Sequence, residues 1–296
     1  MKKTFYLSAI ILFIFISLSY NSRGQGVTIV DDITQGQAGT FNDWSESGVM
    51  ARIGNLIYLY DLENYPYSLW VVNTTNYEAQ LIGKYKGIYE NIEYGGKLYV
   101  SVREGSKKKL IAIAQDNSVQ EISSSTDTKR FLTVFNNELY FADDDVLKKY
   151  NDTSNEVTDV YEFYWFAGIR DMTATDNNLF IIGGIEEGTA LFTSDGTNGG
   201  THNYYTINTG NEFNSKIYMT PVGDKVFFFY DENGEGYKLW VTDGTANRAF
   251  ALKSHEVLSF DNLNKNKNII AYNGKFYYRG DGAEGDNLYV SDGTVS

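Results

Sequence analysis

A short motif that recurs six times constrains the fold of this chain more than any other feature. Each copy has two turn residues, drawn from Gly, Asn and Asp, followed by two large apolar residues. Successive copies begin 40 to 50 residues apart, and a repeat of this length is typical of propellers, solenoids and other arrays of one supersecondary unit. The apolar pairs are Ile57–Tyr58, Leu98–Tyr99, Leu139–Tyr140, Leu179–Phe180, Val226–Phe227 and Phe276–Tyr277.

A second motif follows each copy of the first and ends in a sharp turn. It reads Leu-Trp-Val-Thr-Asp-Gly-Thr at 239–245 and is intact in two further copies, at 191–197 and 288–294. Eroded copies begin at Leu69, Leu110 and Leu147. The alternation of apolar, β-branched and aromatic residues before each turn predicts a strand.

The Asp-Gly pair of this motif predicts the geometry of the turn. Asp bonds to its own backbone, and Gly adopts the positive φ that reverses the chain, so we interpret each Asp as a turn former. We therefore expect positive φ at Gly196, Gly244 and Gly293. Gly244→Ala should then cost about 1 kcal/mol or more of stability.

The second motif resembles the E-L-W-x-x-D-G-T repeat of secreted bacterial proteins, many of them described as hyalin-like. The resemblance spans nearly all of the chain after residue 24, although only three copies keep D-G-T. The resemblance implies a β-repeat architecture and an extracellular or surface setting, and the family has no common established activity. The leading Glu of the repeat is replaced by Ser68, Ala190, Lys238 and Asn287.

Each repeat unit contains four short segments with strand character. Two belong to the motifs, one follows the D-G-T turn, as at 204–207, and one closes the unit, as at 269–272. Four strands in 40 to 50 residues are typical of one blade of a β-propeller. The sequence therefore predicts an all-β propeller, and the alternative is an open β solenoid or repeat array.

The strand count predicts six blades and a closed ring. Five complete units are preceded by two strands, Val27–Ile33 and Val49–Ile53, and followed by two more at 276–278 and 288–290. We expect these four strands to form one mixed blade, which would leave no free sheet edge at the ends of the chain.

The first 24 residues have the layout of a secretory signal peptide. Met1-Lys2-Lys3 is basic, the run 7–18 is apolar, and small residues precede a plausible cleavage point after Gly24. The apolar run is shorter than the roughly 20 residues that span a bilayer. We expect residues 25–296 to form a single exported propeller domain, secreted or at the cell surface, with no membrane insertion after signal removal.

Composition excludes several kinds of site and partner. A net charge of −13 disfavours nucleic acid and anionic membranes, which an acidic protein repels. With no cysteine, the chain has no disulfide, thiolate nucleophile or zinc–thiolate site. The expected partner is an unidentified protein or glycan.

Acidic residues gather in the hairpins between the two motif strands, at 143–145, 186–188, 231–236 and 281–286. They predict an acidic rim, with Asp231, Asn233, Asp281 and Asp286 as calcium candidates because calcium takes oxygen ligands. Residues 231–236 start like an EF-hand loop, but its twelfth position is Thr242, not Glu. We therefore expect salt to stabilise the protein modestly, and calcium to do no better at matched ionic strength.

Few residues suggest catalysis. His202 and His255 have no neighbouring nucleophile motif and are interpreted as surface residues. Trp44 and Trp165 fall outside the repeat register and are the candidates for ligand stacking, whereas Trp70 and Trp240 share a core position. We favour a binding or scaffold module without catalysis of its own. The alternatives are a carbohydrate-active hydrolase with axial carboxylates and a segment of a larger repeat adhesin.

Overall fold

The computed structural model describes nine parts of the chain, and every regular element in them is a β-strand. The described part therefore has no helix that could span a membrane. The expected signal peptide and the expected strand Val27–Ile33 lie outside it. The described residues are 47–62, 65–127, 129–164, 168–208, 219–230, 238–245, 249–252, 269–282 and 285–294.

Six antiparallel sheets follow one another along the chain, and we number them blades 1 to 6. Each is built from consecutive strands in hydrogen-bonded order. Blade 1 contains β1 (Ser47–Ile53), β2 (Leu56–Asp61), β3 (Tyr67–Asn73) and β4 (Ala79–Tyr85). Blade 2 contains β5 (Gly87–Tyr94), β6 (Lys97–Glu104), β7 (Lys107–Ile113) and β8 (Val119–Ser125). Blade 3 contains β9 (Lys129–Phe135), β10 (Glu138–Asp143), β11 (Val146–Asn151) and β12 (Glu156–Glu162). Blade 4 contains β13 (Ile169–Ala174), β14 (Leu179–Ile185), β15 (Gly188–Ser194) and β16 (His202–Asn208). Blade 5 contains β17 (Thr220–Val222), β18 (Lys225–Tyr230), β19 (Lys238–Thr242) and β20 (Ala249–Ala251). Blade 6 contains β21 (Ile269–Tyr272), β22 (Lys275–Gly282) and β23 (Gly285–Ser291).

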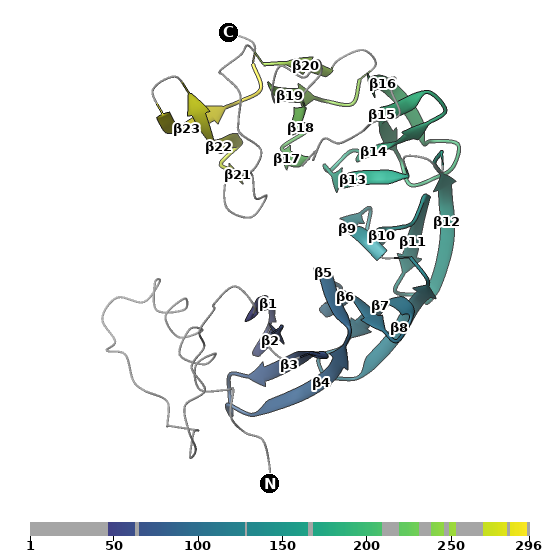
Figure 1. Ribbon diagram of the computed structural model, residues 1–296, viewed down its shortest axis with the longest axis vertical. Coiled ribbons are helices and arrows are strands. Elements are labelled where there is room, and N and C mark those ends of the chain that lie inside the picture. Colours follow the sequence, from purple (N-terminus) through teal and green to yellow (C-terminus); the bar gives the residue numbers. More distant parts are fainter. Residues whose placement is uncertain are drawn as a thin grey trace.

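The six sheets are arranged around an arc, with the first strand of each sheet on its inner side (Figure 1). The inner strands of consecutive blades are neighbours, from β1 and β5 through to β17 and β21. This is the arrangement of propeller blades, so the predicted fold and the predicted number of blades are confirmed. Among the described strands, the arc is open between blade 6 and blade 1 (Figure 1).

The predicted pairing of Val49–Ile53 with the C-terminal strands is wrong. This segment belongs to β1, which pairs with β2 from Ile53↔Leu56 to Ser47↔Asp61. The two-residue turn at Gly54–Asn55 joins the two strands directly, and strands joined by such a turn pair as a hairpin. Each blade therefore begins one strand before the sequence unit that we defined.

The apolar pair of the first motif forms the contacts between blades. Its second residue packs against the first residue of the next blade's pair, as Tyr58 does with Leu98 and Phe227 does with Phe276. All five interfaces between consecutive blades bury such a pair. Because neighbouring side chains on a strand point to opposite faces, one dipeptide serves two interfaces.

The intact D-G-T turns share one hydrogen-bonding scheme. In blade 4, Asp195 Oδ1 accepts bonds from Thr197 N at 2.9 Å and Thr197 Oγ1 at 2.7 Å. The turns of blades 5 and 6 repeat these two bonds. The φ angles of Gly196, Gly244 and Gly293 are 90°, 79° and 77°. The predicted turn geometry and the role of Asp as a turn former are confirmed.

The same glycines contact the preceding blade. A Cβ atom on Gly196 would lie 2.1 Å from Tyr140 Oη, and one on Gly244 would lie 2.9 Å from Phe180 Cε1. Tyr140 and Phe180 are the second residues of the apolar pairs of blades 3 and 4. Each glycine therefore allows the turn of one blade to rest on the aromatic ring of the blade before it.

In blade 3 an aspartate occupies the glycine position, and the contact with the preceding blade is polar. Asp152 Oδ1 accepts bonds from Lys97 Nζ at 2.6 Å and from Tyr99 Oη at 3.0 Å. Tyr99 is the second residue of the pair in blade 2. Asp152 thus replaces a van der Waals contact by an ion pair and a hydrogen bond.

Blade 6 has one uncovered face. Leu288 of the second motif is 76% exposed, whereas the leucine at this position is at most 8% exposed in the other five blades. Ile270, Tyr272 and Val290 of blade 6 are also more than half exposed. In blades 1 to 5 this face packs against the next blade, so the described part of the chain leaves one such face without its neighbour.

Candidate functional site

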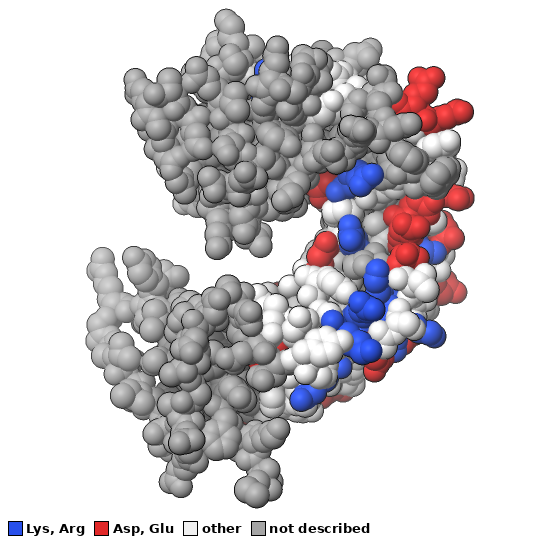
Figure 2. All heavy atoms as spheres, viewed as in Figure 1, with Lys and Arg blue, Asp and Glu red and all other residues white. Residues whose placement is uncertain are grey.

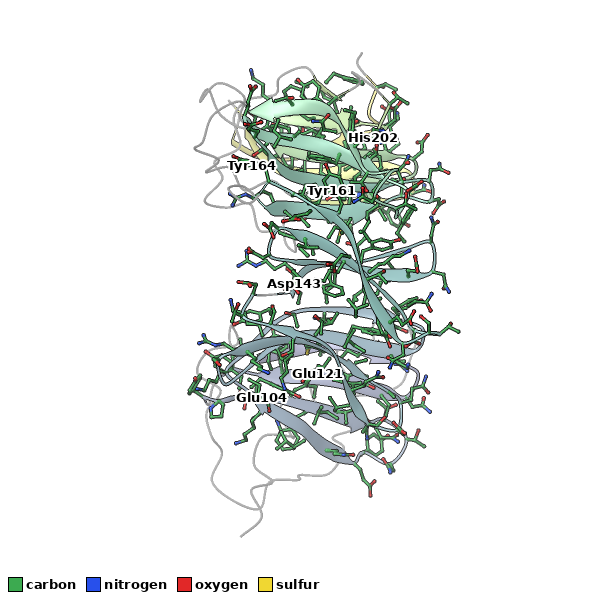
Figure 3. All side chains as sticks on the ribbon, turned by 90° about the vertical axis from the view of Figure 1, so that its right-hand side faces the viewer. Glu104, Glu121, Asp143, Tyr161, Tyr164 and His202 are labelled. Atoms are coloured by element: carbon green, nitrogen blue, oxygen red, sulfur yellow. The ribbon has the colours of Figure 1, made fainter. Side chains whose placement is uncertain are left out.

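A groove of about 620 Å³ opens between blades 3 and 4 on the outer side of the arc. One wall is the end of β12 and the segment that follows it, from Tyr161 to Tyr164. The opposite wall is the β14–β15 hairpin with Ile185 and Glu186, and the start of β16 completes the site at residues 201–203. Figure 3 shows Tyr161, Tyr164 and His202 on this outer side.

Aromatic rings form the floor of the groove. Phe163 and Phe192 are almost fully buried and meet edge to face, with ring centroids 4.9 Å apart. Tyr161 packs against both, at 4.9 Å from Phe163 and 6.0 Å from Phe192. Such edge-to-face pairs stabilise a fixed arrangement of rings, so the floor is preformed.

A glycine inside β14 makes room for this floor. A Cβ atom on Gly183 would lie 2.2 Å from Phe163 Cδ1, so no larger residue fits under the ring. The next residue, Gly184, accepts a bond from Tyr164 N at 3.2 Å and donates one to Gly168 O at 2.8 Å. Phe163 N donates to Asp145 O at 2.9 Å. These hydrogen bonds hold Phe163, Tyr164 and Gly168, the described residues between the two blades, in place.

The rim of the groove is polar and acidic. Tyr164 is 40% exposed, and Glu162, Glu186, His202 and Asn203 are exposed as well. The lining contains two glutamates and no lysine or arginine. In Figure 2, acidic side chains gather along the outer margin of blades 3 and 4.

The side chains of the predicted acidic rim are described at two of its four hairpins, because residues 231–236 and the side chains of 281–286 lie outside what the structure describes. The β10–β11 hairpin carries Asp143–Asp145, and the β14–β15 hairpin carries Glu186 and Glu187. The same hairpin in blade 2, between β6 and β7, is followed by Lys107 and Lys108. Figure 2 accordingly shows Lys and Arg side chains over blade 2. The charge of this face therefore changes sign along the arc.

Like charges meet at the β10–β11 hairpin. Partial burial raises the pKa of Asp144 above its ordinary value, and the carboxylates of Asp127, Asp145 and Asp143 raise it further, against an opposing effect of Lys108. Asp144 also has a positive φ of 62°, a conformation that Asn tolerates well.

Asp144→Asn should therefore stabilise the protein at pH 7. Because the folded-state pKa is raised, ionised Asp144 lowers stability as the pH rises through that pKa, and the effect is absent below the unfolded pKa. Solvent screening limits the gain to a few tenths of a kcal/mol, or about 1 °C in melting temperature. Thermal scans at pH 3 and pH 7 measure this difference.

A matched substitution tests whether the stabilisation by Asp144→Asn comes from the charges around Asp144. Asp159 forms an ion pair with Lys148, at 2.6 Å between Oδ1 and Nζ. Asp159→Asn should be neutral or slightly destabilising at pH 7. An equal stabilisation by both substitutions would instead reflect the reduced net charge of the chain, and would contradict a local effect at Asp144.

The structure places two of the four calcium candidates near each other. Asp281 and Asp286 are cross-strand partners in the β22–β23 hairpin, and their side chains are not among those described. Asp231 and Asn233 lie outside the described residues. Where side chains are described, no three His, Asp or Glu residues gather as a metal site would require. The four residues stay calcium candidates, and the expectation that calcium stabilises the protein no more than salt does stays a prediction.

The aromatic and histidine candidates have mixed outcomes. Trp44, Trp165 and His255 lie outside the described residues. Trp240 is buried in the contact between blades 4 and 5, as predicted, and Trp70 is half-buried. His202 is exposed, as predicted, but it lies at the rim of the groove. Sequence reasoning missed Tyr161, Phe163 and Tyr164, for which the signal was the Gly183–Gly184 pair inside an apolar strand.

Comparison with solved structures identifies β-propellers. The chain superposes on TolB from Acinetobacter baumannii with a TM-score of 0.50 and 13% identity, covering 82% of this chain and 63% of TolB. It superposes on the β-propeller domain of the Trilobed protease from Pyrococcus furiosus with a TM-score of 0.53 and 13% identity, covering 85% and 84%. A prolyl endopeptidase gives a TM-score of 0.56 and 9% identity, covering 85% and 42%.

These likenesses concern the fold alone. The chain spans less than two thirds of the TolB chain and of the prolyl endopeptidase chain. The Trilobed protease propeller is described as having an open velcro topology. No protein-family model matches the sequence, and no curated protein matches it.

Proposed function

We propose that this chain is a secreted or cell-surface binding and scaffold module without catalysis of its own. The groove between blades 3 and 4 carries the proposal. It combines a preformed aromatic floor with a few polar groups at the rim, which is the usual composition of a ligand site. Export is supported by the basic start and the apolar run at 7–18. The partner is a protein or a glycan.

The proposal is tested with arrays of peptides and oligosaccharides, followed by titration of the hits. Tyr164→Ala should weaken binding about tenfold, the usual effect of losing one aromatic contact. The control Tyr65→Ala removes a tyrosine that is 64% exposed on blade 1 and should leave binding unchanged. Mass spectrometry should recover the ligand intact. Conversion of the ligand, or binding that ignores Tyr164→Ala, would contradict the proposal.

The uncovered face of blade 6 supports a second candidate function, a segment of a larger repeat protein. Five copies of this face bury the leucine of the second motif against a following blade. In blade 6 the equivalent leucine, Leu288, is exposed, and so is Val290 two residues later. A further blade of the same repeat would cover it, with an aromatic pair and a D-G-T turn in the usual places.

Cysteine labelling distinguishes an uncovered face from a covered one, because the chain has no cysteine of its own. We expect Leu288→Cys in the 296-residue chain to react with a maleimide at least about tenfold faster than Leu239→Cys, its buried equivalent in blade 5. In the protein as made by its native host, Leu288→Cys should be protected. Equal reactivity of Leu288→Cys in both preparations would contradict a larger repeat protein.

A further inference from the structure

The charge of the groove selects the kind of ligand that it can hold. Glu162 belongs to the β12 wall and Glu186 to the opposite hairpin, so an exposed glutamate lies on each side of the groove. The lining has no Lys or Arg to offset them, and its one basic side chain is the imidazole of His202. The net charge of −13 adds a long-range attraction for cations and a repulsion for anions. An anionic ligand is therefore disfavoured and a cationic one favoured.

The aromatic residues of the groove further restrict the kind of cationic ligand that it can bind. Tyr161 and Tyr164 line the groove together with the two glutamates, and an ammonium or guanidinium group gains energy over the face of a phenol ring. Phe163 and Phe192 are each only 3% exposed, so the half-buried ring of Tyr161 that packs on them supplies most of the apolar surface. Lys and Arg side chains have this dual character, with an apolar stem and a cationic head.

The size and position of the groove suit a polypeptide segment better than a lone amine. Its volume of about 620 Å³ is that of a site for a medium-sized ligand. It lies between β12 and β16, which are the outermost strands of their sheets. An extended chain can run between two such sheet edges and present alternate side chains to the groove.

We propose that the groove binds an extended segment of a partner protein through a Lys or Arg side chain. The apolar stem lies against the half-buried ring of Tyr161, which packs on Phe163 and Phe192, and the cationic head lies at Glu162 and Glu186 on the rim. This inference rests on the proposed binding function and names the partner chemistry of the same groove.

The experiment titrates the full chain with capped five-residue peptides of Gly and Ser that carry one central test residue, followed by NMR into the millimolar range. The test residues are Lys, Arg, and their neutral counterparts norleucine and citrulline. Lys or Arg peptides should bind about tenfold more tightly than the neutral ones, as expected for one charge-assisted contact. Binding should weaken as the salt concentration rises.

Two substitutions separate the groove from the general acidity of the chain. Glu186→Gln should weaken binding of the cationic peptides about tenfold. Glu187→Gln removes the same charge one residue further along the hairpin, at a residue that does not line the groove, and should leave binding nearly unchanged. Equal losses in both variants, or equal binding of norleucine and lysine peptides, would overturn the inference.

A neutral oligosaccharide that binds in a Tyr164-dependent way would overturn this inference and leave the binding module intact. An absence of any ligand whose binding depends on Tyr164 would overturn both proposals. The two failures are therefore distinguishable in the same set of titrations.

Discussion

Gly244→Ala should lower the free energy of unfolding by about 2–4 kcal/mol, well above the roughly 1 kcal/mol expected for the positive φ alone. The added Cβ would lie 2.9 Å from both Phe180 Cε1 and Thr193 Cγ2. Both neighbours are buried, and Phe180 is fully enclosed between blades 4 and 5. Neither can move without disturbing that interface. Urea unfolding monitored by tryptophan fluorescence measures the loss.

The same blade offers a matched control. Gly223 has a φ of 63°, and a Cβ atom there would meet nothing within 4 Å. Gly223→Ala should therefore show the backbone penalty alone, about 1 kcal/mol. In a Phe180→Ala background the excess cost of Gly244→Ala should shrink, because the crowding ring is gone. Equal costs for the two glycines would contradict a packing role for the D-G-T turn.

The turn contact explains why the two motifs recur together. In blades 3, 4 and 5 the second residue of the apolar pair is the surface on which the turn glycine of the next blade rests, as Tyr140 is for Gly196. The positive φ could be predicted because turn chemistry is local. The contact could not, because it joins residues about 60 positions apart in different repeat units, and one sequence does not show which units become neighbours.

Strand pairing at the chain ends shows the limit of counting strands. The number of blades follows from the repeat, but the partner of Val49–Ile53 depends on where each blade begins. A repeat has no marked start, so the same period allows several assignments of strands to blades. The two-residue turn at Gly54–Asn55 favours the local hairpin with β2. This local geometry determines the pairing of Val49–Ile53, whereas closure of the ring does not.

The groove could not be predicted from the sequence, for a different reason. Its floor is formed by Phe163, which follows β12, and by Phe192 in β15, and these residues meet only when two blades pack. The linker between the blades has no repeat register, so periodicity did not single it out. Gly183 was the readable signal, since a glycine inside an apolar strand often marks the close approach of another group.

Asp152→Ala should cost about 2–3 kcal/mol of stability at pH 7, because it leaves two donors of the preceding blade without their acceptor. Burial alone would raise the pKa of Asp152, but hydrogen bonds from Lys97, Tyr99 and Tyr150 outweigh it and hold that pKa below its ordinary value. Tyr99 is fully buried, so its hydroxyl has no access to water as a substitute partner. Asp152→Asn keeps an acceptor and should cost less, about 1 kcal/mol.

The pH dependence separates the charge of Asp152 from its size. Because the folded-state pKa is depressed, the contribution of Asp152 is present above the unfolded pKa, near 4, and is lost as the pH falls through the folded value. The stability difference between the wild type and Asp152→Asn should therefore shrink from pH 6 toward pH 3. The exposed pair Lys148–Asp159 supplies the control, since Asp159→Asn should change stability by no more than about 0.5 kcal/mol at any pH.

A double-mutant cycle with Tyr99→Phe then isolates the contact between blades 2 and 3. Tyr99→Phe alone removes the hydroxyl that donates to Asp152 and should cost about 1 kcal/mol. The hydroxyl of Tyr99 and the carboxylate of Asp152 should stabilise the protein through the hydrogen bond between them. The double variant Asp152→Ala/Tyr99→Phe should then be about 1 kcal/mol more stable than the sum of the two single losses predicts. Strictly additive losses would show that the hydrogen bond between Tyr99 and Asp152 does not stabilise the protein, and would leave the ion pair of Asp152 with Lys97 as the contact that joins the two blades.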